Sequence, residues 1–175
     1  MTVRIRPSMS GDLAAYTVMM QATYESAYVD ESIGLTKACF SPEVFASDDT
    51  RDYLQSKLVN NDTQKSWMAV DEGAIIGAVT IEAHGSECKL SGFYVLPDYQ
   101  GRGVGTMLWQ KAVEFADGRA ITLDIYTHNK KTIQLYEHWG FREDTTQPRL
   151  YYHWPEWPEG LRAEAMCMRR EGSQV

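Results

Sequence analysis

A glycine-rich turn at the start of an apolar helix constrains this chain more than any other feature. Residues 97–108 read PDYQGRGVGTML, with glycine at positions 101, 103 and 105. Glycine is a poor helix former, so the run costs stability unless bare backbone is needed there. A strand that enters a helix through such a turn exposes several N–H groups at the positive end of the helix dipole. The pattern therefore predicts a turn that holds phosphate groups.

Two familiar phosphate-binding loops do not fit this turn. A Walker A loop requires G-K-[ST], but Gly105 is followed by Thr106 and Met107. A dinucleotide fingerprint beginning at Gly101 requires glycine or alanine at position 106 and repeated strand–helix–strand units around it. Asp124 does lie about 20 residues downstream, as that fingerprint expects. The surrounding order of elements still excludes it.

The hydrophobic pattern predicts an α+β fold. Strands are predicted over 3–6, 67–70, 74–82, 88–96, 120–126, 141–145 and 163–169, and helices over 10–25, 47–58, 104–116 and 130–139. Strands that follow one another with few crossovers favour a mixed, mostly antiparallel central sheet flanked by helices. Residues 88–126 are expected to form one parallel, right-handed crossover.

Length and composition are those of a single domain over residues 1–175. The chain is 43% hydrophobic and 23% charged, which is ordinary for a globular protein. No apolar run approaches the about 18 residues of a membrane span. The start, MTVRIRPSMSGDL, lacks the apolar stretch of a signal peptide, so we expect a cytoplasmic protein without a membrane partner. Three scattered cysteines without a C-x-x-C indicate neither a disulfide framework nor a metal site.

The net charge of -7 argues against a nucleic-acid partner, because phosphate binding usually needs a basic face. An acidic balance is compatible with a cationic substrate such as a free amine. A net negative charge is also what a protein surface needs simply to stay soluble.

A third turn pattern, Q/R-x-x-G-x-G/A, is met by Gln100, Gly103 and Gly105, and here the chain resembles the GNAT superfamily of N-acetyltransferases. FYVLPDYQGRGVGTMLWQKAVEFA looks like the family's central strand, turn and helix. NKKTIQLYEHWGFRE looks like its second motif, in which asparagine is followed seven residues later by tyrosine and then by G-F. The predicted order of elements also resembles the family fold.

The resemblance implies acetyl-CoA as cosubstrate and assigns its binding residues. The central strand should bulge and part from its parallel neighbour, so that backbone groups meet the pantetheine and the acetyl carbonyl. Asn129 should bond the pantetheine arm, cap the following helix, or both. Lys130 and Lys131 are weaker candidates for the 3′-phosphate, and Arg102 is as readily a solvated side chain. The cofactor-binding residues are thus Phe93, Tyr94, Val95, Gln100, Gly101, Arg102, Gly103, Val104, Gly105, Thr106, Asn129 and Tyr136.

The resemblance also suggests the catalytic groups. Tyr136 occupies the position of the family's tyrosine and would donate a proton to the leaving thiolate. The alternative interpretation is that Tyr136 is simply an inward-facing core residue of its helix. Many relatives carry a glutamate on the central strand, but CKLSGFYV has no carboxylate. Asp124 is the best substitute as general base, with Glu82 or a chain of waters as alternatives. An exposed strand carboxylate without a catalytic role is the other interpretation of Asp124.

The acceptor site is the least patterned part of the chain. The first two helices and segment 148–160 are expected to shape it, and LYYHWPEWPEG (150–160) is a lid, a homodimer contact or simply a packed loop. YESAYVDESIGLTKACFSPEVF loosely resembles polyamine or small-amine acetyltransferases, while peptide N-termini, amino sugars and aminoglycoside-like amines stay open. The leading hypothesis is direct acetyl transfer to a primary amine. The alternatives are a non-catalytic acyl-CoA-binding module and a structural protein that assembles through 150–160.

Overall fold

Strands from both halves of the chain join in one mixed sheet. The structure is a computed structural model that describes residues 2–173; Met1 and 174–175, which the expected domain includes, lie outside the described residues. Within the described part the sheet order is β1-β2-β3-β4-β5-β8-β6, and β7 also pairs with β8. Its strands are β1 (Arg4–Pro7), β2 (Gln64–Asp71), β3 (Ala74–His84), β4 (Glu87–Val95), β5 (Ala120–Tyr126), β6 (Arg142–Glu143), β7 (Leu150–Tyr152) and β8 (Ala163–Arg170).

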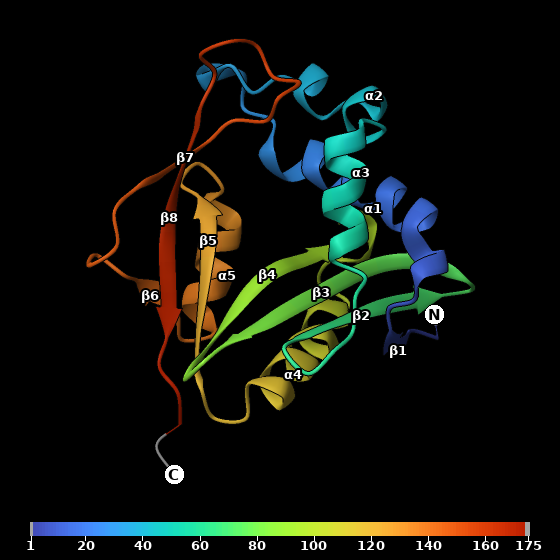
Figure 1. The fold of residues 1–175 in the computed structure, drawn as a ribbon, viewed down its shortest axis with the longest axis vertical. Helices are drawn as coiled ribbons and strands as arrows, with labels where there is room; N and C mark the ends of the chain where they lie inside the picture. Colours follow the sequence, from blue (N-terminus) through green and yellow to red (C-terminus); the bar gives the residue numbers. More distant parts are fainter. Residues whose placement is uncertain (1, 174–175) are drawn as a thin grey trace.

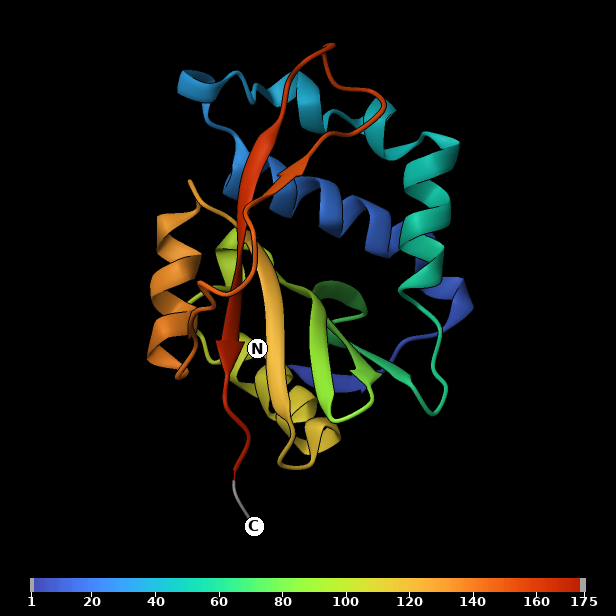
Figure 2. The same cartoon turned by 60° about the vertical axis from the view of Figure 1, so that its left-hand side comes forward.

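Helices cover both faces of this sheet (Figures 1 and 2). One face carries the helices from the first third of the chain, and the other carries the two later helices. The Ser41 and Ser47 hydroxyls accept hydrogen bonds from the N–H groups of Val44 and Thr50, which fixes where two of the early helices begin. The helices are α1 (Leu13–Tyr28), α2 (Pro42–Phe45), α3 (Asp48–Ser56), α4 (Val104–Ala116) and α5 (Lys130–His138).

Alternation along the strands divides the apolar residues between two cores. In β5, Ile121, Leu123 and Ile125 point to the core under α4 and α5. Asp124, between them, points to the opposite side and lines a pocket there. Each face of β5 therefore has its own role, as the alternation of that strand predicts.

β4 and β5 part soon after they meet. They pair in parallel only from Glu87 opposite Ala120 to Lys89 opposite Thr122, and Figure 1 shows them diverging beyond that point. On the other side of β4, Thr80 pairs with Gly92 while Ile81 pairs with Leu90, so the intervening Ser91 is an extra residue, a β-bulge. The predicted bulge, the parallel crossover and the split are confirmed.

The bulge also changes which side chains face which helices. Without it, residues at odd positions of β4 would stay on one face. With it, Phe93 packs in the α4–α5 core and Tyr94 packs against the core under α1. The single extra residue thus decides that Phe93 faces the α4–α5 core and Tyr94 the core under α1, rather than the reverse.

The sequence prediction was wrong in the C-terminal third. The strand predicted over 141–145 shrinks to Arg142–Glu143. The segment 150–160, predicted as loop throughout, begins with β7, whose Leu150–Tyr152 pairs antiparallel with Ala163–Ala165 of β8. A three-residue strand is too short for a pattern of alternation to be visible, and the long-range pairing with β8 creates it.

Candidate active site

The glycine turn lies where β4 leads into α4. Gly101 and Gly103 have φ of 72° and 83°, which L side chains rarely adopt. Gly105 is different, because it is helical and a Cβ there would lie 3.6 Å from the Phe93 ring, an ordinary contact. The fold therefore requires two of the three glycines. Nothing in the protein's own packing requires the third.

The backbone N–H groups of this turn have no protein acceptor. Among residues 2–173, none of the amides of 101–106 donates to a protein oxygen, and the N-cap Gly103 supplies no side chain to α4. The first N–H group that is satisfied there is that of Met107, which donates to the Gly103 carbonyl. Helix N-termini attract anions through such amides and through the helix dipole. The predicted phosphate-binding geometry is therefore present.

Side chains from two elements surround the turn. Gln100 donates from Nε2 to the Val95 carbonyl at 3.0 Å and accepts at Oε1 from Lys131 Nζ at 2.9 Å. These bonds tie the N-terminus of α5 to the turn and engage one of the backbone groups predicted to meet the cofactor, the Val95 carbonyl. Arg102 lies over the Tyr99 ring, 5.7 Å from its centroid. The cation that links α5 to the turn is thus Lys131 of α5, and Arg102 instead packs on Tyr99.

Asn129 and Tyr136 lie on the same face of the sheet as the turn. Asn129 is 8% exposed and its Oδ1 accepts from Thr132 N–H at 3.3 Å, so it caps α5. The Tyr136 ring packs between Phe93 and Phe141, with centroid distances of 6.3 and 5.5 Å. Within the described residues its hydroxyl bonds no protein group. Burial raises the pKa of Tyr136, so the hydroxyl keeps its proton.

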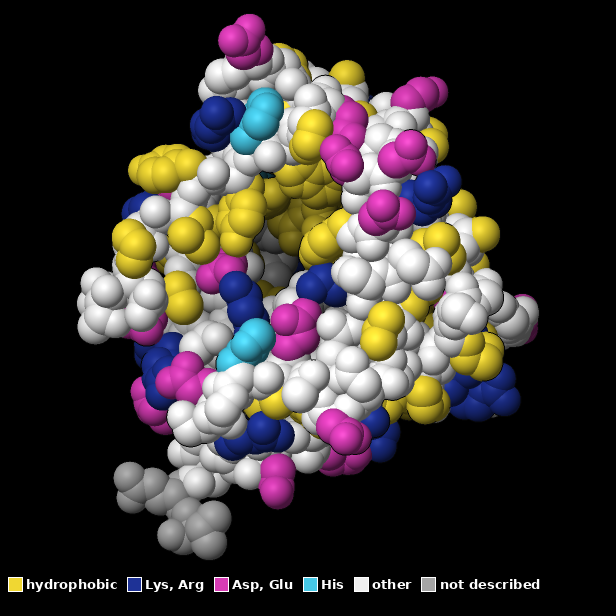
Figure 3. All heavy atoms as spheres, in the orientation of Figure 1, with side chains coloured by type: hydrophobic (Ala, Val, Ile, Leu, Met, Phe, Trp, Pro, Cys, Tyr) yellow, Lys and Arg dark blue, Asp and Glu magenta, His cyan; other side chains and the backbone are white. Residues whose placement is uncertain are grey.

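The opposite face of the sheet holds a pocket of about 580 Å³. Figure 3, in the orientation of Figure 1, shows it as a hollow with hydrophobic walls and with basic and acidic side chains at its rim. It lies over the diverging strands β4 and β5, between α1, α3 and the segment after β7. Its lining includes Tyr24, Tyr28, Asp49, Tyr53, Lys57, Glu82, Lys89, Ser91, Tyr94, Asp124, Tyr126, Tyr152, His153, Trp154 and Glu156.

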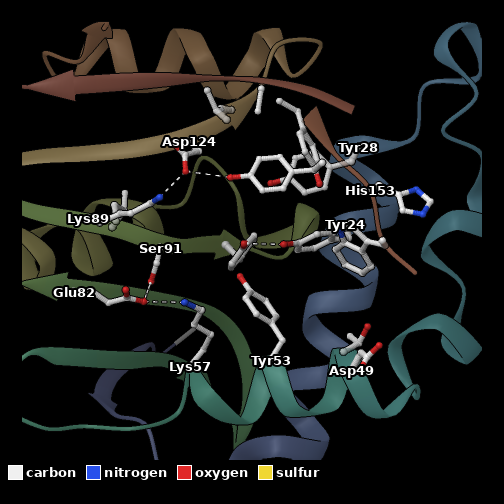
Figure 4. A pocket seen from close by; sticks show the side chains of 18 of the residues that line it. Tyr24, Tyr28, Asp49, Tyr53, Lys57, Glu82, Lys89, Ser91, Asp124 and His153 are labelled. Atoms are coloured by element: carbon white, nitrogen blue, oxygen red, sulfur yellow. Dashed lines mark hydrogen bonds and ion pairs between the residues drawn. The ribbon is translucent and has the colours of Figure 1, made fainter. Parts of the chain in front are cut away.

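Two lysine–carboxylate pairs stand at one end of the pocket (Figure 4). Lys89 Nζ lies 2.6 Å from Asp124 Oδ2, which also accepts from the Tyr152 hydroxyl at 3.2 Å. Asp124 Oδ1 has no protein donor among residues 2–173. Asp124 is therefore not the exposed strand carboxylate of the alternative interpretation: its side chain is 16% exposed and faces the pocket.

The second pair holds Glu82 more tightly. Its Oε1 accepts from Lys57 Nζ at 2.8 Å and from the Ser91 hydroxyl at 2.6 Å. Burial opposes ionisation of Glu82, but these hydrogen bonds outweigh it and leave its pKa lowered. A lowered pKa makes a carboxylate a weaker base. Of the two carboxylates predicted as bases, Asp124 has the more available oxygen.

Aromatic rings form the other end of the pocket. The Tyr24 and Tyr94 hydroxyls lie 3.0 Å apart, and the Tyr24 ring lies 4.7 Å from Tyr28 and 5.4 Å from Trp154, measured between centroids. Tyr28 in turn meets Tyr126 edge-on at 4.9 Å. Burial raises the pKa of Tyr126 to about 12. We call Tyr24, Tyr28, Tyr94, Tyr126 and Trp154 the aromatic wall.

The predicted site residues thus divide between two faces. The glycine turn, Gln100, Lys131 and Asn129 gather around the N-termini of α4 and α5, and Tyr136 lies on the same face, near the end of α5. Asp124 and Glu82 lie across the sheet in the pocket, and the gap between β4 and β5 lies between the two groups. The sequence predicted Tyr94 as a site residue through its backbone, but it did not indicate Lys57, Lys89, Glu156 or the rest of the aromatic wall, although segment 150–160, which supplies Trp154 and Glu156, was noted.

The sequence model of the acetyltransferase (GNAT) family matches residues 29–141. This chain belongs to that family. The match runs from the end of α1 through the glycine turn to α5, so it contains both motifs on which the resemblance rests. GNAT members are acyltransferases that use acetyl-CoA as cosubstrate.

Curated relatives and solved structures agree with this family. The GNAT chain is 31% identical over 116 residues to the [Ribosomal protein bS18]-alanine N-acetyltransferase of Escherichia coli. The aligned region covers 65% of this chain and 70% of that relative. It is 31% identical over 103 residues to the N-alpha-acetyltransferase RimI of Mycobacterium tuberculosis, 57% of this chain and 61% of that protein. A third curated relative is matched over only 19% of its length. The chain therefore spans less than two thirds of the length of that relative and of the M. tuberculosis protein.

The fold is shared with a coenzyme A complex. The crystal structure of the PaiA N-acetyltransferase of Thermoplasma acidophilum with coenzyme A superposes with a TM-score of 0.69 over 98% of this chain and 99% of that one. The two sequences are 16% identical, so the likeness concerns the fold. In the described part of the GNAT chain, no helix has the length and apolar character needed to cross a membrane.

Proposed function

We propose that this enzyme transfers the acetyl group of acetyl-CoA to a small cationic primary amine, by direct attack in a ternary complex. One observation carries the proposal. A turn with six unsatisfied amides lies on one face of the sheet, a lined pocket lies on the other, and β4 and β5 part between them. A thioester held in that gap meets an amine from the pocket without any covalent enzyme intermediate.

The residues on the sheet face that carries the glycine turn support binding of the cofactor's diphosphate at that turn. The amides of 101–106 donate to its oxygens, and Lys131 adds a positive charge beside them. The lack of a side chain at Gly105 lets the diphosphate approach the first turn of α4. Phe93 and Tyr94 offer backbone groups at the open edge of β4, and Asn129 directs its amide nitrogen to the pantetheine arm.

The chemistry requires proton transfers from the nitrogen and to the sulfur. The bound alkylammonium first loses a proton to Asp124, directly or through water; the neutral amine nitrogen then attacks the thioester carbonyl carbon, and the extra proton on the nitrogen of the intermediate passes to solvent. The tetrahedral intermediate then expels the thiolate, which takes a proton from the Tyr136 hydroxyl. An alkylammonium has a pKa of about 10.4, so a base is needed near neutral pH. The raised pKa of Tyr136 keeps the donor protonated there.

The pocket favours a small cationic acceptor. Its lining holds four carboxylates, at Asp49, Glu82, Asp124 and Glu156, against two lysines. Trp154 and Glu156 from the segment after β7 form part of its wall, and Tyr152 bonds across it to Asp124. A pocket lined by carboxylates and aromatic rings suits a short cationic amine.

A peptide N-terminus is the second candidate. It is favoured by the names of the relatives, of which the E. coli enzyme acts on an alanine of ribosomal protein bS18. The third possibility, a module that binds acyl-CoA without turnover, is opposed by the presence of both Asn129 and a Tyr136 hydroxyl that bonds no protein group within residues 2–173.

An amine panel with acetyl-CoA, followed by free thiol release, tests the proposal. Small diamines and monoamines should release thiol, and Tyr136→Phe should abolish most of that release while coenzyme A still binds. Release only with peptides that begin with alanine would favour the second candidate. Binding of coenzyme A without release on any amine would favour the module. A homodimer through 150–160 stays a prediction, which light scattering tests.

A further inference from the structure

Two of the pocket's carboxylates have no cationic partner. Glu82 and Asp124 are each paired with a lysine. In contrast, Asp49 is an exposed residue at the pocket and forms no side-chain hydrogen bond or ion pair within residues 2–173. Oε2 of Glu156 is buried and has no hydrogen-bond partner in the same part of the chain. A buried carboxylate oxygen without a donor is costly, so this atom points to a donor that the protein does not supply.

Asp49 lies at the aromatic end of the pocket, and Glu156 lines the same pocket. In Figure 4 the lysine–carboxylate pairs stand on the left, and Asp49, Tyr24, Tyr28 and His153 stand on the right. Glu156 follows Trp154 by two residues, and the Trp154 ring contacts Tyr24 and Phe45, with centroids 5.4 and 5.7 Å apart. Glu156 lines the same pocket as Trp154 and the other residues of the aromatic wall.

Rings and a carboxylate together recognise one kind of group. Aromatic faces attract a cation through their quadrupole, most strongly when water is excluded. A carboxylate adds a charged hydrogen bond to an ammonium or guanidinium. An uncharged alkyl group would also fit the rings, but it would leave Glu156 Oε2 without a donor.

We infer that the acceptor carries a second positive group, which does not react and is held by the aromatic wall and Glu156 with Asp49. This inference rests on the proposed function, since the reacting amine is taken to lie at Asp124. The acceptor class is then a diamine or a guanidinium-bearing amine. Glu156 is then the residue of the enzyme that determines acceptor specificity, and Glu156 takes no part in the acetyl transfer itself.

Diaminobutane and butylamine test the inference, because they share a carbon chain and differ only in the second amine. The wild-type enzyme should show a kcat/KM for diaminobutane about tenfold to a hundredfold above that for butylamine, the range for one charged hydrogen bond. Glu156→Gln keeps the shape of the side chain and should reduce that ratio to about threefold or less. The loss should appear in KM rather than in kcat, and it should be larger for diaminobutane than for butylamine.

Glu159→Gln is the matched control, since Glu159 lies three residues away in the same segment, is exposed and does not line the pocket. It should leave the ratio as in the wild type. Equal rates for the two amines in the wild type, or a loss in Glu156→Gln that is the same for both amines, would overturn the inference while acetyl transfer still stands.

Calorimetry separates this inference from the proposed function. Diaminobutane should bind the enzyme saturated with coenzyme A, and Glu156→Gln should weaken that binding about tenfold or more. If binding follows this pattern but no amine releases thiol, the acceptor site stands and the transfer reaction fails. If diaminobutane does not bind, or binds both variants equally, the inference is refuted.

Discussion

Replacing Gly103 by glutamate separates the structural role of the glycine turn from its role in binding the cofactor. Gly103 has φ of 83° and a Cβ there meets no atom within 4 Å. An L residue in this left-handed conformation costs about 1–2 kcal/mol. The new carboxylate would also stand among the amides that we propose for the diphosphate. We therefore expect modest destabilisation and complete loss of cofactor binding.

The structure supplies a matched control at Gly73. It lies in the turn between β2 and β3, has φ of 88°, and a Cβ at this position would likewise meet no atom within 4 Å. Gly73→Glu should suffer the same conformational cost far from the site. An unfolding entropy of about 2.1 cal/mol/K per residue converts about 1–2 kcal/mol into a Tm lower by about 3–5 °C for a chain of this length.

Thermal unfolding with and without acetyl-CoA gives the result. At about a hundredfold excess over Kd, a ligand stabilises the folded state by about 2.7 kcal/mol, which raises Tm by about 7 °C here. The wild type and Gly73→Glu should both show that rise, and Gly103→Glu should show none. A full rise in Gly103→Glu would refute the assignment of the turn to the diphosphate.

Three further changes test other parts of the account. Tyr136→Phe should lower kcat by about a hundredfold or more while the thermal shift with acetyl-CoA stays at the wild-type size; unchanged kcat would remove the tyrosine from the mechanism. Asp124→Asn should lower kcat/KM near neutral pH and recover as pH approaches the amine pKa of about 10.4, where the acceptor deprotonates unaided. The same profile in Glu82→Gln but not in Asp124→Asn would make Glu82 the base. The hydrogen bond from Arg6 lowers the pKa of Asp12. Asp12 therefore stabilises the fold above its unfolded pKa of about 3.9 and loses that effect as pH falls further. In a series of urea-unfolding measurements at decreasing pH, Asp12→Asn should reduce the fall in the free energy of unfolding below that pH.

Local patterns predicted the cofactor side well. The strand, glycine turn and helix over 88–116 follow one another in sequence, so their residues carry the evidence for their own geometry. Helix α4 has the predicted bounds of 104–116 and β5 those of 120–126. The split between β4 and β5 was also predicted, because the family resemblance implies it.

The acceptor side depends on contacts that no local pattern contains. Tyr24 and Tyr94 are 70 residues apart in sequence and share a hydrogen bond. Lys89 and Asp124 belong to different strands and pair only because β4 and β5 start in register. Strand β7 exists only because β8 returns beside it. The second-cation site at Glu156 is built from such contacts, so it needed the folded structure.

The most direct test of the central claim is a crystal structure of the enzyme with coenzyme A. The account predicts diphosphate oxygens within hydrogen-bond distance of the amides of 101–106 and the thiol in the gap between β4 and β5, facing the pocket that Asp124 lines. Coenzyme A bound elsewhere, with those amides turned to solvent and the gap closed by side chains, would contradict it.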